Sequence, residues 1–283
     1  MHLLGYLAAA GAAGAAGAIN AVAGGGTLVS FSTLLGLGVP AVTANVTNTV
    51  ALVPAYLAGS WGQRSDLKPQ LRKARGLAVA AFTGGLGGSI LLINIPAGVF
   101  RLTAPYLILF ACALLLVEGR LRSRIGAASV DAPAPDTEDP ERRGAVARSE
   151  HPHQGMRAGP RAPSTSAWTP PAVCAVFAAA VYGGFFGAGL GIMVMAVLSL
   201  FGSDSLVEVN ALKQALSFII NLVAAGFFLF SGHVSWPVVP AMAVAGVAGG
   251  LVGSRLVRVI KPSQLRVAVI VTGVAVAIAL WVT

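Results

Sequence analysis

The chain has 283 residues, of which 56% are hydrophobic and only 10% are charged, with a mean hydropathy of +0.80. Soluble domains typically have about 25% charged residues, so this composition excludes an ordinary soluble protein and predicts a protein of the lipid bilayer. The net charge of +9 does not indicate nucleic-acid binding, because the basic residues lie in loops beside apolar segments, where lipid headgroups and insertion rules account for them.

Ten apolar segments follow one another along the chain. They lie at approximately 3–23, 27–39, 41–60, 76–94, 103–119, 171–187, 190–202, 206–230, 236–254 and 264–282. Crossing a bilayer takes about 20 residues, and segments 27–39 and 190–202 are too short to be secure spans. Each of these two segments follows a glycine cluster, which lets the chain break and turn back. Each half is therefore expected to be a broken or re-entrant hairpin followed by three transmembrane helices.

The two halves of the chain carry the same motif. Residues 77–89 read LAVAAFTGGLGGS and residues 242–254 read MAVAGVAGGLVGS, which match at eight of thirteen positions without a gap. The same offset along the chain also aligns glycine and amide positions outside the motif, namely Gly24 with Gly189, Gly26 with Gly191 and Asn45 with Asn210. Internal repeats are a recurrent plan of secondary transporters. The sequence therefore predicts an all-α polytopic bundle of two membrane repeats, 1–119 and 170–283.

Residues 120–169 interrupt the apolar pattern. They are rich in proline, hold six of the ten acidic residues and have almost no large apolar side chains. A segment of this composition cannot bury enough surface to fold. It is expected to be a disordered linker between the two repeats.

Loop charges predict the orientation, since loops rich in Lys and Arg stay in the cytoplasm. Loop 61–75 has five basic residues and loop 94–102 has one, so the first is expected inside and the second outside. In the second half the order reverses, because 231–236 has no Lys or Arg and 255–266 has four. Equivalent loops then face opposite sides. This predicts inverted repeats in a multi-pass plasma-membrane protein, with both termini outside and the linker in the cytoplasm.

Most polar residues outside the loops and the linker are concentrated in two equivalent helices. The first is expected to begin at Pro40, a favoured first-turn residue, and the second with a capping box from Ser205 to Glu208. In inverted repeats the substrate site lies near the bilayer midplane, where broken helices of both halves meet. The candidate substrate-binding residues lie on these helices and in the glycine clusters: Gly24, Gly25, Gly26, Thr43, Asn45, Asn48, Gly189, Gly191, Asn210, Lys213, Gln214 and Ser217.

Lys213 is the most informative single residue. At about 1.5 Å rise per residue it lies roughly 10 Å beyond the predicted helix start, and a cation near a helix centre costs about 2.5–3.5 kcal/mol on insertion scales. One interpretation is that its stem extends to the cytoplasmic interface or that it pairs with Glu208. The other is that its charge faces an anionic substrate, with neighbouring amides and hydroxyls supplying neutral hydrogen bonds.

The other candidates also have structural alternatives. Asn45 and Asn210 can join membrane helices by hydrogen bonds. The clusters Gly24–Gly26 and Gly189–Gly191 either allow tight packing or free backbone N–H groups at the next helix start, which favour anions. For the later GxxxG segments, tight helix packing is the preferred interpretation, and it concerns Gly84, Gly85, Gly88, Gly249, Gly250 and Gly253.

The repeated order of these segments resembles that of the TauE/SafE sulfite-exporter family, and the resemblance covers the chain except the linker. The stretches that carry it are Ala23–Thr27, Thr43–Thr49, Gly84–Ser89, Gly187–Gly191, Asn210–Ser217, Ser231–Trp236 and Gly249–Ser254. The resemblance implies a membrane permease that moves sulfite, sulfonates or related organosulfur anions, usually outward.

Export of an anion also agrees with the energetics, because a negative cell interior favours each departing negative charge by about 2.3 kcal/mol per 100 mV. No carboxylate lies in the middle of a predicted helix, so transport driven by the potential, without a proton relay, is expected. An anion channel and a structural or assembly protein remain alternatives. An enzyme is not expected, and neither the two cysteines nor the four histidines predict a metal site or cofactor. The sequence leaves open whether the chain forms a homo-oligomer.

Overall fold

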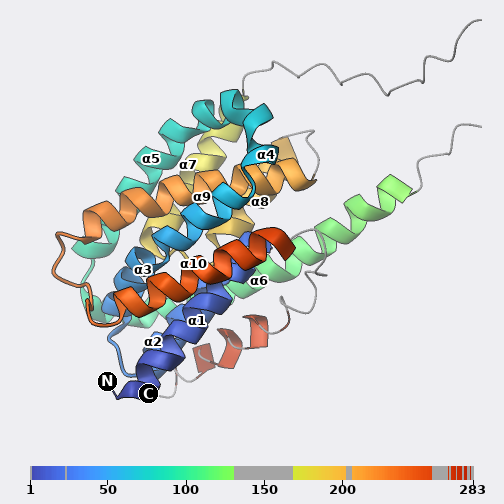
Figure 1. Cartoon of the computed structure of the whole chain (residues 1–283). Coiled ribbons are helices and arrows are strands. Elements are labelled where there is room, and N and C mark those ends of the chain that lie inside the picture. The colour runs from blue at the N-terminus through green and yellow to red at the C-terminus, as the bar shows by residue number, and fades with distance from the viewer. Residues whose placement is uncertain are drawn as a thin grey trace, which may run out of the picture. The chain divides into compact units, whose positions relative to one another are not determined.

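The computed structural model of the chain describes residues 2–22, 24–130, 168–201 and 206–256, and after these the helical positions 267, 269–271, 273–275, 277–278 and 281. The regular elements of this described part are all helices (Figure 1). Five of them, α1, α5, α6, α9 and α10, are long and apolar enough to cross a membrane. Large apolar side chains are exposed on these helices, as a lipid-facing surface requires. The predicted all-α membrane fold is confirmed.

The helices follow the apolar segments of the sequence closely. Their bounds are α1 Leu3–Val22, α2 Thr27–Gly36, α3 Ala41–Gly62, α4 Arg64–Leu67, η1 Lys68–Gln70, α5 Leu71–Asn94, α6 Ala97–Val130, α7 Pro170–Phe185, α8 Leu190–Phe201, α9 Leu206–Phe228 and α10 Val239–Leu256. With 10 and 12 residues, α2 and α8 are too short to span the hydrocarbon core alone. Pro40 precedes α3 as its N-cap instead of lying in its first turn. Ser205, at the start of the predicted capping box, lies outside the described residues.

The expected linker requires a correction. Residues 120–130 continue helix α6, so the prediction of disorder from residue 120 onward is wrong for this stretch. The reason is local, because Arg and Ala favour helix and the first proline comes only at position 133. Residues 131–167, the rest of the expected linker up to Trp168, lie outside the described residues. Contacts place 1–119 and 168–283 in one compact unit and 120–167 in a second, so the two predicted repeats share one unit.

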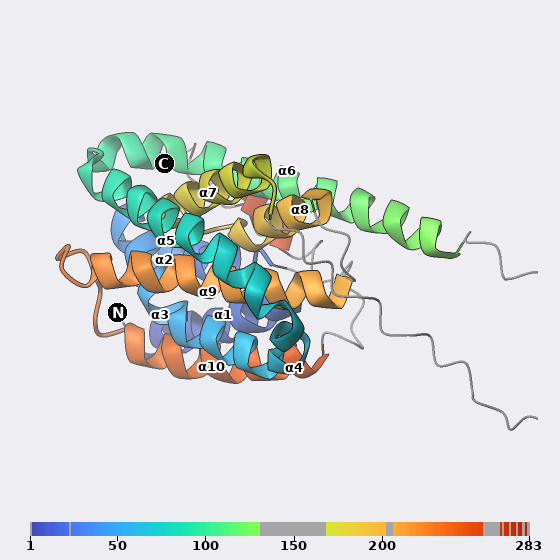
Figure 2. The same cartoon turned by 90° about the horizontal axis from the view of Figure 1, so that it is seen from above.

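Helix contacts in the larger unit are symmetric under exchange of the two halves. The offset of the sequence repeat pairs α1 with α7, α2 with α8, α3 with α9 and α5 with α10. α1 packs against α10, and its counterpart α7 packs against α5. α3 packs against α10, and its counterpart α9 packs against α5. The pair of α1 and α10 lies side by side in two perpendicular views (Figure 1, Figure 2). The sequence repeat is therefore also a repeat in space.

The equivalent helices α3 and α9 run antiparallel. Near the start of α9, Asn210 donates a hydrogen bond to Gln63 Oε1 at 2.6 Å, just beyond the end of α3. After the end of α9, the backbone N–H of Ser235 donates to Thr47 Oγ1 at 2.9 Å, near the start of α3. Inverted repeats require equivalent helices to run in opposite directions. The inverted topology and the membrane orientation of the loops stay predictions.

The glycines of the two GxxxG segments lie at helix contacts, as the packing interpretation predicts. On α5, a Cβ added to Gly84 would lie 2.6 Å from the backbone oxygen of Phe177 in α7. On α10, a Cβ added to Gly253 would lie 2.5 Å from the backbone oxygen of Ala18 in α1. Both approaches are too close for any residue with a side chain. Gly84 thus holds α5 of the first half against α7, the first helix of the second half, and Gly253 holds α10 of the second half against α1, the first helix of the first half.

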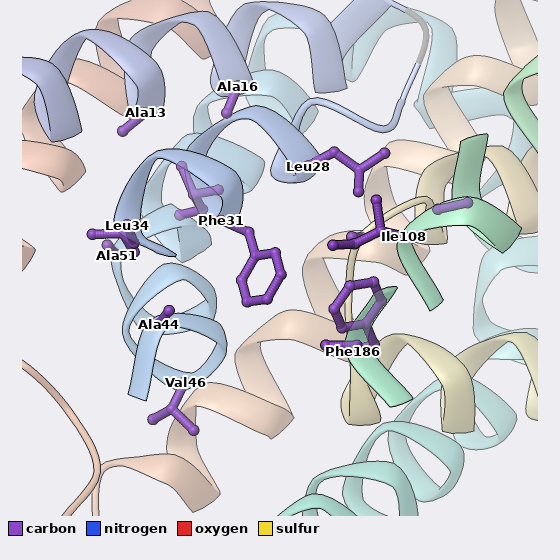
Figure 3. Close-up of a cluster of buried hydrophobic side chains, with 14 of the residues drawn as sticks. Ala13, Ala16, Leu28, Phe31, Leu34, Ala44, Val46, Ala51, Ile108 and Phe186 are labelled. Carbon is purple, nitrogen blue, oxygen red and sulfur yellow. The ribbon is translucent and has the colours of Figure 1, made fainter. Parts of the chain in front are cut away.

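Aromatic side chains fill the core beside the two short helices. Phe31 of α2 and Phe186, which follows α7, meet edge to face with ring centroids 5.2 Å apart. Figure 3 shows these two rings together with Leu28 of α2 and Ile108 of α6. All four side chains are almost completely buried. This packing fixes the beginning of α2 against the end of α7, where the two glycine clusters also lie.

Candidate substrate site

The two glycine clusters touch each other. α1 ends at Val22 and the chain turns through Gly24 and Gly25, whose φ angles of +94° and +82° are left-handed and favour glycine. In the second half the turn is made by Gly187 and Gly189, with φ angles of +73° and +81°. A Cβ added to Gly24 would lie 3.1 Å from the carbonyl carbon of Gly191. The sequence repeat thus brings the breaks of both halves to one place.

Amide side chains of each half bind the broken helix of the other half. Asn210 of α9 donates a hydrogen bond through Nδ2 to the backbone oxygen of Ala21, at the end of α1, at 3.1 Å. Its repeat counterpart Asn45 of α3 donates through Nδ2 to the backbone oxygen of Phe185, at the end of α7, at 2.9 Å. The last carbonyls of a helix have no partner within the helix. The two asparagines therefore act as reciprocal caps, which is the helix-joining role that their structural alternative describes.

Lys213 lies beside Gly191 of the second cluster, near the end of α1, and is buried. Its side chain is 1% exposed, and it is the only Lys, Arg, Asp or Glu among the buried residues that the structure describes. Its Nζ donates a hydrogen bond to the backbone oxygen of Asn20 at 3.0 Å. Its stem passes Gly191, since a Cβ added there would lie 3.7 Å from Lys213 Cδ. The ammonium group is thus held inside the protein at the carboxyl end of α1, and does not extend to the surface.

Asn20 was not among the residues predicted from the sequence, yet it organises this site. Its Oδ1 accepts a hydrogen bond from the backbone N–H of Gly26 at 2.7 Å, and its Nδ2 donates to the Tyr56 hydroxyl at 3.2 Å. The Gly26 N–H, which one of the two interpretations of the cluster left free for an anion, is therefore bound by a side chain. The signal available in the sequence was a single amide in an otherwise alanine-rich helix, and its repeat counterpart is Phe185.

The charged residue has a neutral counterpart in the first half. The offset of the repeat pairs Lys213 with Asn48. Asn48 is also buried, and its Nδ2 donates to the backbone oxygen of Thr27, the first residue of α2, at 3.2 Å. Asn48 and Lys213 therefore both hold the connection from α1 to α2. The two halves thus have equivalent backbones at this position, but only the second half has a charged side chain there.

Several buried side-chain oxygens have no hydrogen-bond partner within the described part of the chain. Five of them lie on α3 and α9: Asn48 Oδ1, Ser60 Oγ, Asn210 Oδ1, Gln214 Oε1 and Ser217 Oγ. Each buried acceptor without a donor costs roughly 1–3 kcal/mol. Buried polar groups of this kind are rare in folded proteins and often mark functional sites.

The structure does not bring all predicted residues to the same place. Thr43 is half-buried one turn before Thr47, and within the described residues it has no hydrogen bond to the site. A Cβ added to Gly25 would lie 3.1 Å from the Ile192 side chain and 3.3 Å from that of Leu115, so this glycine is closely packed as well as part of the turn. Gln63 was taken as part of a loop, because it follows the apolar run and precedes basic residues, yet it is buried and bound to Asn210. No group of three or more metal-ligating side chains occurs in the described residues.

Comparisons with known proteins place this geometry in context. The model of the family described as "Sulfite exporter TauE/SafE" matches residues 9–280, which is nearly the whole chain. A protein of Haemophilus influenzae described as "Probable membrane transporter protein" is 25% identical over 253 residues, covering 89% of this chain and 85% of that protein. No solved structure matches the chain.

Proposed function

The chain belongs to the sulfite exporter TauE/SafE family of membrane transporters, and on that premise we propose that it moves a small anion, sulfite or an organosulfonate, outward across the plasma membrane by alternating access. The observation that carries the proposal is the buried ammonium group of Lys213. A charge in this position is costly and is by default a sign of function in a membrane protein.

Lys213 is proposed to bind the anionic group of the substrate. In the present conformation its Nζ bonds the backbone oxygen of Asn20, near the end of α1, where the helix dipole supplies partial negative charge. A substrate anion is a stronger partner for an ammonium group than a carbonyl oxygen. Binding would therefore shift the side chain from the end of α1 to the substrate, while the amides around it supply neutral hydrogen bonds.

The repeat supplies the means of alternating access. The site lies where the broken helices of the two halves touch, and Asn45 and Asn210 hold each break through the other half. Rocking of one half against the other around such a point is the usual motion of inverted-repeat transporters. The reciprocal caps would then open and close in turn, with the termini outside and residues 120–169 on the cytoplasmic side.

The proposed driving force is the membrane potential. Among the described residues, no Asp or Glu is buried, so this part of the chain has no visible proton relay. The potential favours each departing negative charge by about 2.3 kcal/mol per 100 mV. We therefore expect a uniporter. An anion channel would share the preference for anions but would not saturate, and a structural or assembly protein would have no flux.

The test is anion flux in proteoliposomes with a clamped potential and no pH gradient. Sulfite is the first probe, with sulfate and chloride as competitors. The expected result is saturable sulfite flux whose rate rises with the potential. Flux that requires a pH gradient at zero potential would reject the uniporter, and flux without saturation would favour the channel. Absence of flux for sulfite and for organosulfonates would reject the proposed substrate class.

A further inference from the structure

We propose that the preferred substrate is an organic anion that carries its own hydrogen-bond donor, such as a hydroxyalkanesulfonate or an aminoalkanesulfonate. Side-chain oxygens in a row on α9 accept the hydrogen bond from this donor. The inference rests on the proposed function, because it specifies the substrate class at the same site. It is carried by the buried side-chain oxygens of α3 and α9 that accept no hydrogen bond from the described residues.

The orientation of two of these amides is fixed by their neighbours. The Nδ2 of Asn210 donates to the backbone oxygen of Ala21 and to Gln63 Oε1, and the Nδ2 of Asn48 donates to the backbone oxygen of Thr27. A backbone oxygen only accepts hydrogen bonds. Exchanging the oxygen and nitrogen of either amide would place oxygen against oxygen, so in both residues the atom without a partner is the acceptor Oδ1.

Three of these five oxygens belong to residues that form a row on one helix face. Asn210, Gln214 and Ser217 are spaced by four and three residues on α9, which places them on the same side of the helix. The row faces α3, because a Cβ added to Gly59 would clash with the Gln214 side chain. None of the three residues is more than 4% exposed. The row therefore lies inside the protein, in contact with α3, the helix that carries Asn48 and Ser60.

Sulfite in its dianionic form and a simple alkanesulfonate cannot use the amide oxygens of this row. Their oxygens are acceptors, so they suit the Lys213 ammonium and the Ser217 hydroxyl, which can donate, but they leave the oxygens of Asn210 and Gln214 without donors. A hydroxyl or ammonium group on the same molecule can serve one or more of these oxygens while the anionic group meets Lys213. A site that hydrogen-bonds a substrate O–H or N–H discriminates strongly against an analogue that lacks it, because the buried partner is left unpaired.

The test compares three sulfonates of nearly equal size in proteoliposomes. They are 2-hydroxyethanesulfonate, 2-aminoethanesulfonate and propane-1-sulfonate, in which the terminal group is a hydroxyl, an ammonium or a methyl. The first and third have the same charge, so their ratio isolates the donor. We expect wild-type kcat/KM for at least one of the donor-bearing sulfonates to exceed that for propane-1-sulfonate by about tenfold or more.

Gln214→Met is the matched variant, since it removes the acceptor and keeps the length of the side chain. It is expected to reduce the discrimination between the sulfonates at least severalfold. The control is Gln70→Met on η1, which also removes a buried Gln oxygen without a described donor but lies away from the α9 row. It should leave the ratio unchanged. The wild-type ratio alone keeps the inference testable if Gln214→Met does not fold.

Equal kcat/KM for all three sulfonates would overturn the inference while leaving anion transport standing. A dependence of all three fluxes on sodium, with no preference among them, would also overturn it, because the oxygens would then hold a cation. Loss of every sulfonate and sulfite flux would instead reject the proposed function itself.

Discussion

Lys213→Gln is expected to lower sulfite flux in proteoliposomes by about 10- to 100-fold. The substitution keeps a hydrogen-bond donor of similar length and removes the only buried charge of the described residues. Hydrogen bonds to charged groups contribute about 1.5–3 kcal/mol, and each 1.4 kcal/mol corresponds to a factor of about ten. Because the cost of burying the ammonium also disappears, the variant should fold at least as well as the wild type, so a loss of flux would report on binding.

Lys68→Gln is the matched control for this experiment. It makes the same chemical change at an exposed position on η1, where removal of a charge has little effect on a buried site. Flux through this variant should equal that of the wild type. Unchanged flux through Lys213→Gln would mean that the anion passes elsewhere and that the lysine has a structural role.

Gly24→Ala is expected to lower thermal stability strongly and to abolish flux. The φ angle of +94° costs a residue with a side chain about 1–2 kcal/mol. In addition, the new Cβ would lie 3.1 Å from the Gly191 carbonyl carbon and the Ile192 nitrogen, which are backbone atoms. Overpacking of this kind costs about 1–3 kcal/mol. The midpoint of thermal unfolding, followed by size-exclusion chromatography after heating in detergent, measures the effect.

Gly38→Ala separates the cost of the left-handed φ angle from the cost of the close contact with backbone atoms. Gly38 has a φ angle of +81°, but a Cβ added there has no atom within 4 Å among its described neighbours. It should therefore suffer only the conformational cost, and it should retain flux. If the two variants lose the same amount of stability, the contact between the glycine clusters carries no energy and the close approach of the two halves is wrong.

The repeat made most of the fold predictable. One fixed offset along the chain aligned glycines and amides across the two halves, and the helix pairs of the structure obey the same exchange. The short segments after the glycine clusters are short helices because the left-handed turns at Gly24 and Gly189 separate them from the helices before. These features could be predicted because the positions of glycines and the lengths of apolar segments are read directly from the sequence and depend little on long-range contacts.

The partners of the polar residues could not be predicted in the same way. Asn45 and Asn210 were recognised as an equivalent pair, but nothing in the sequence identifies the backbone oxygens of Phe185 and Ala21 as their acceptors. Asn20 was missed because its repeat counterpart is Phe185, so the repeat shows no equivalent pair of polar residues at this position. Which polar groups meet depends on how the two halves pack, and a single sequence does not contain that information directly.

The length of α6 was missed for a different reason. The loss of apolar residues after Gly119 was interpreted as the end of the helix, although hydropathy reports on burial and not on backbone conformation. Residues 120–130 combine Arg and Ala with no proline, which allows the helix to continue.

The most direct test of the account is equilibrium binding of radiolabelled sulfite to the purified protein in detergent, with wild type and Lys213→Gln measured side by side. Binding depends on the site alone, without the conformational steps of transport. The account predicts saturable binding to the wild type and at least about tenfold weaker binding to the variant. Equal affinity of the two proteins would place the anion away from Lys213 and contradict the proposed site.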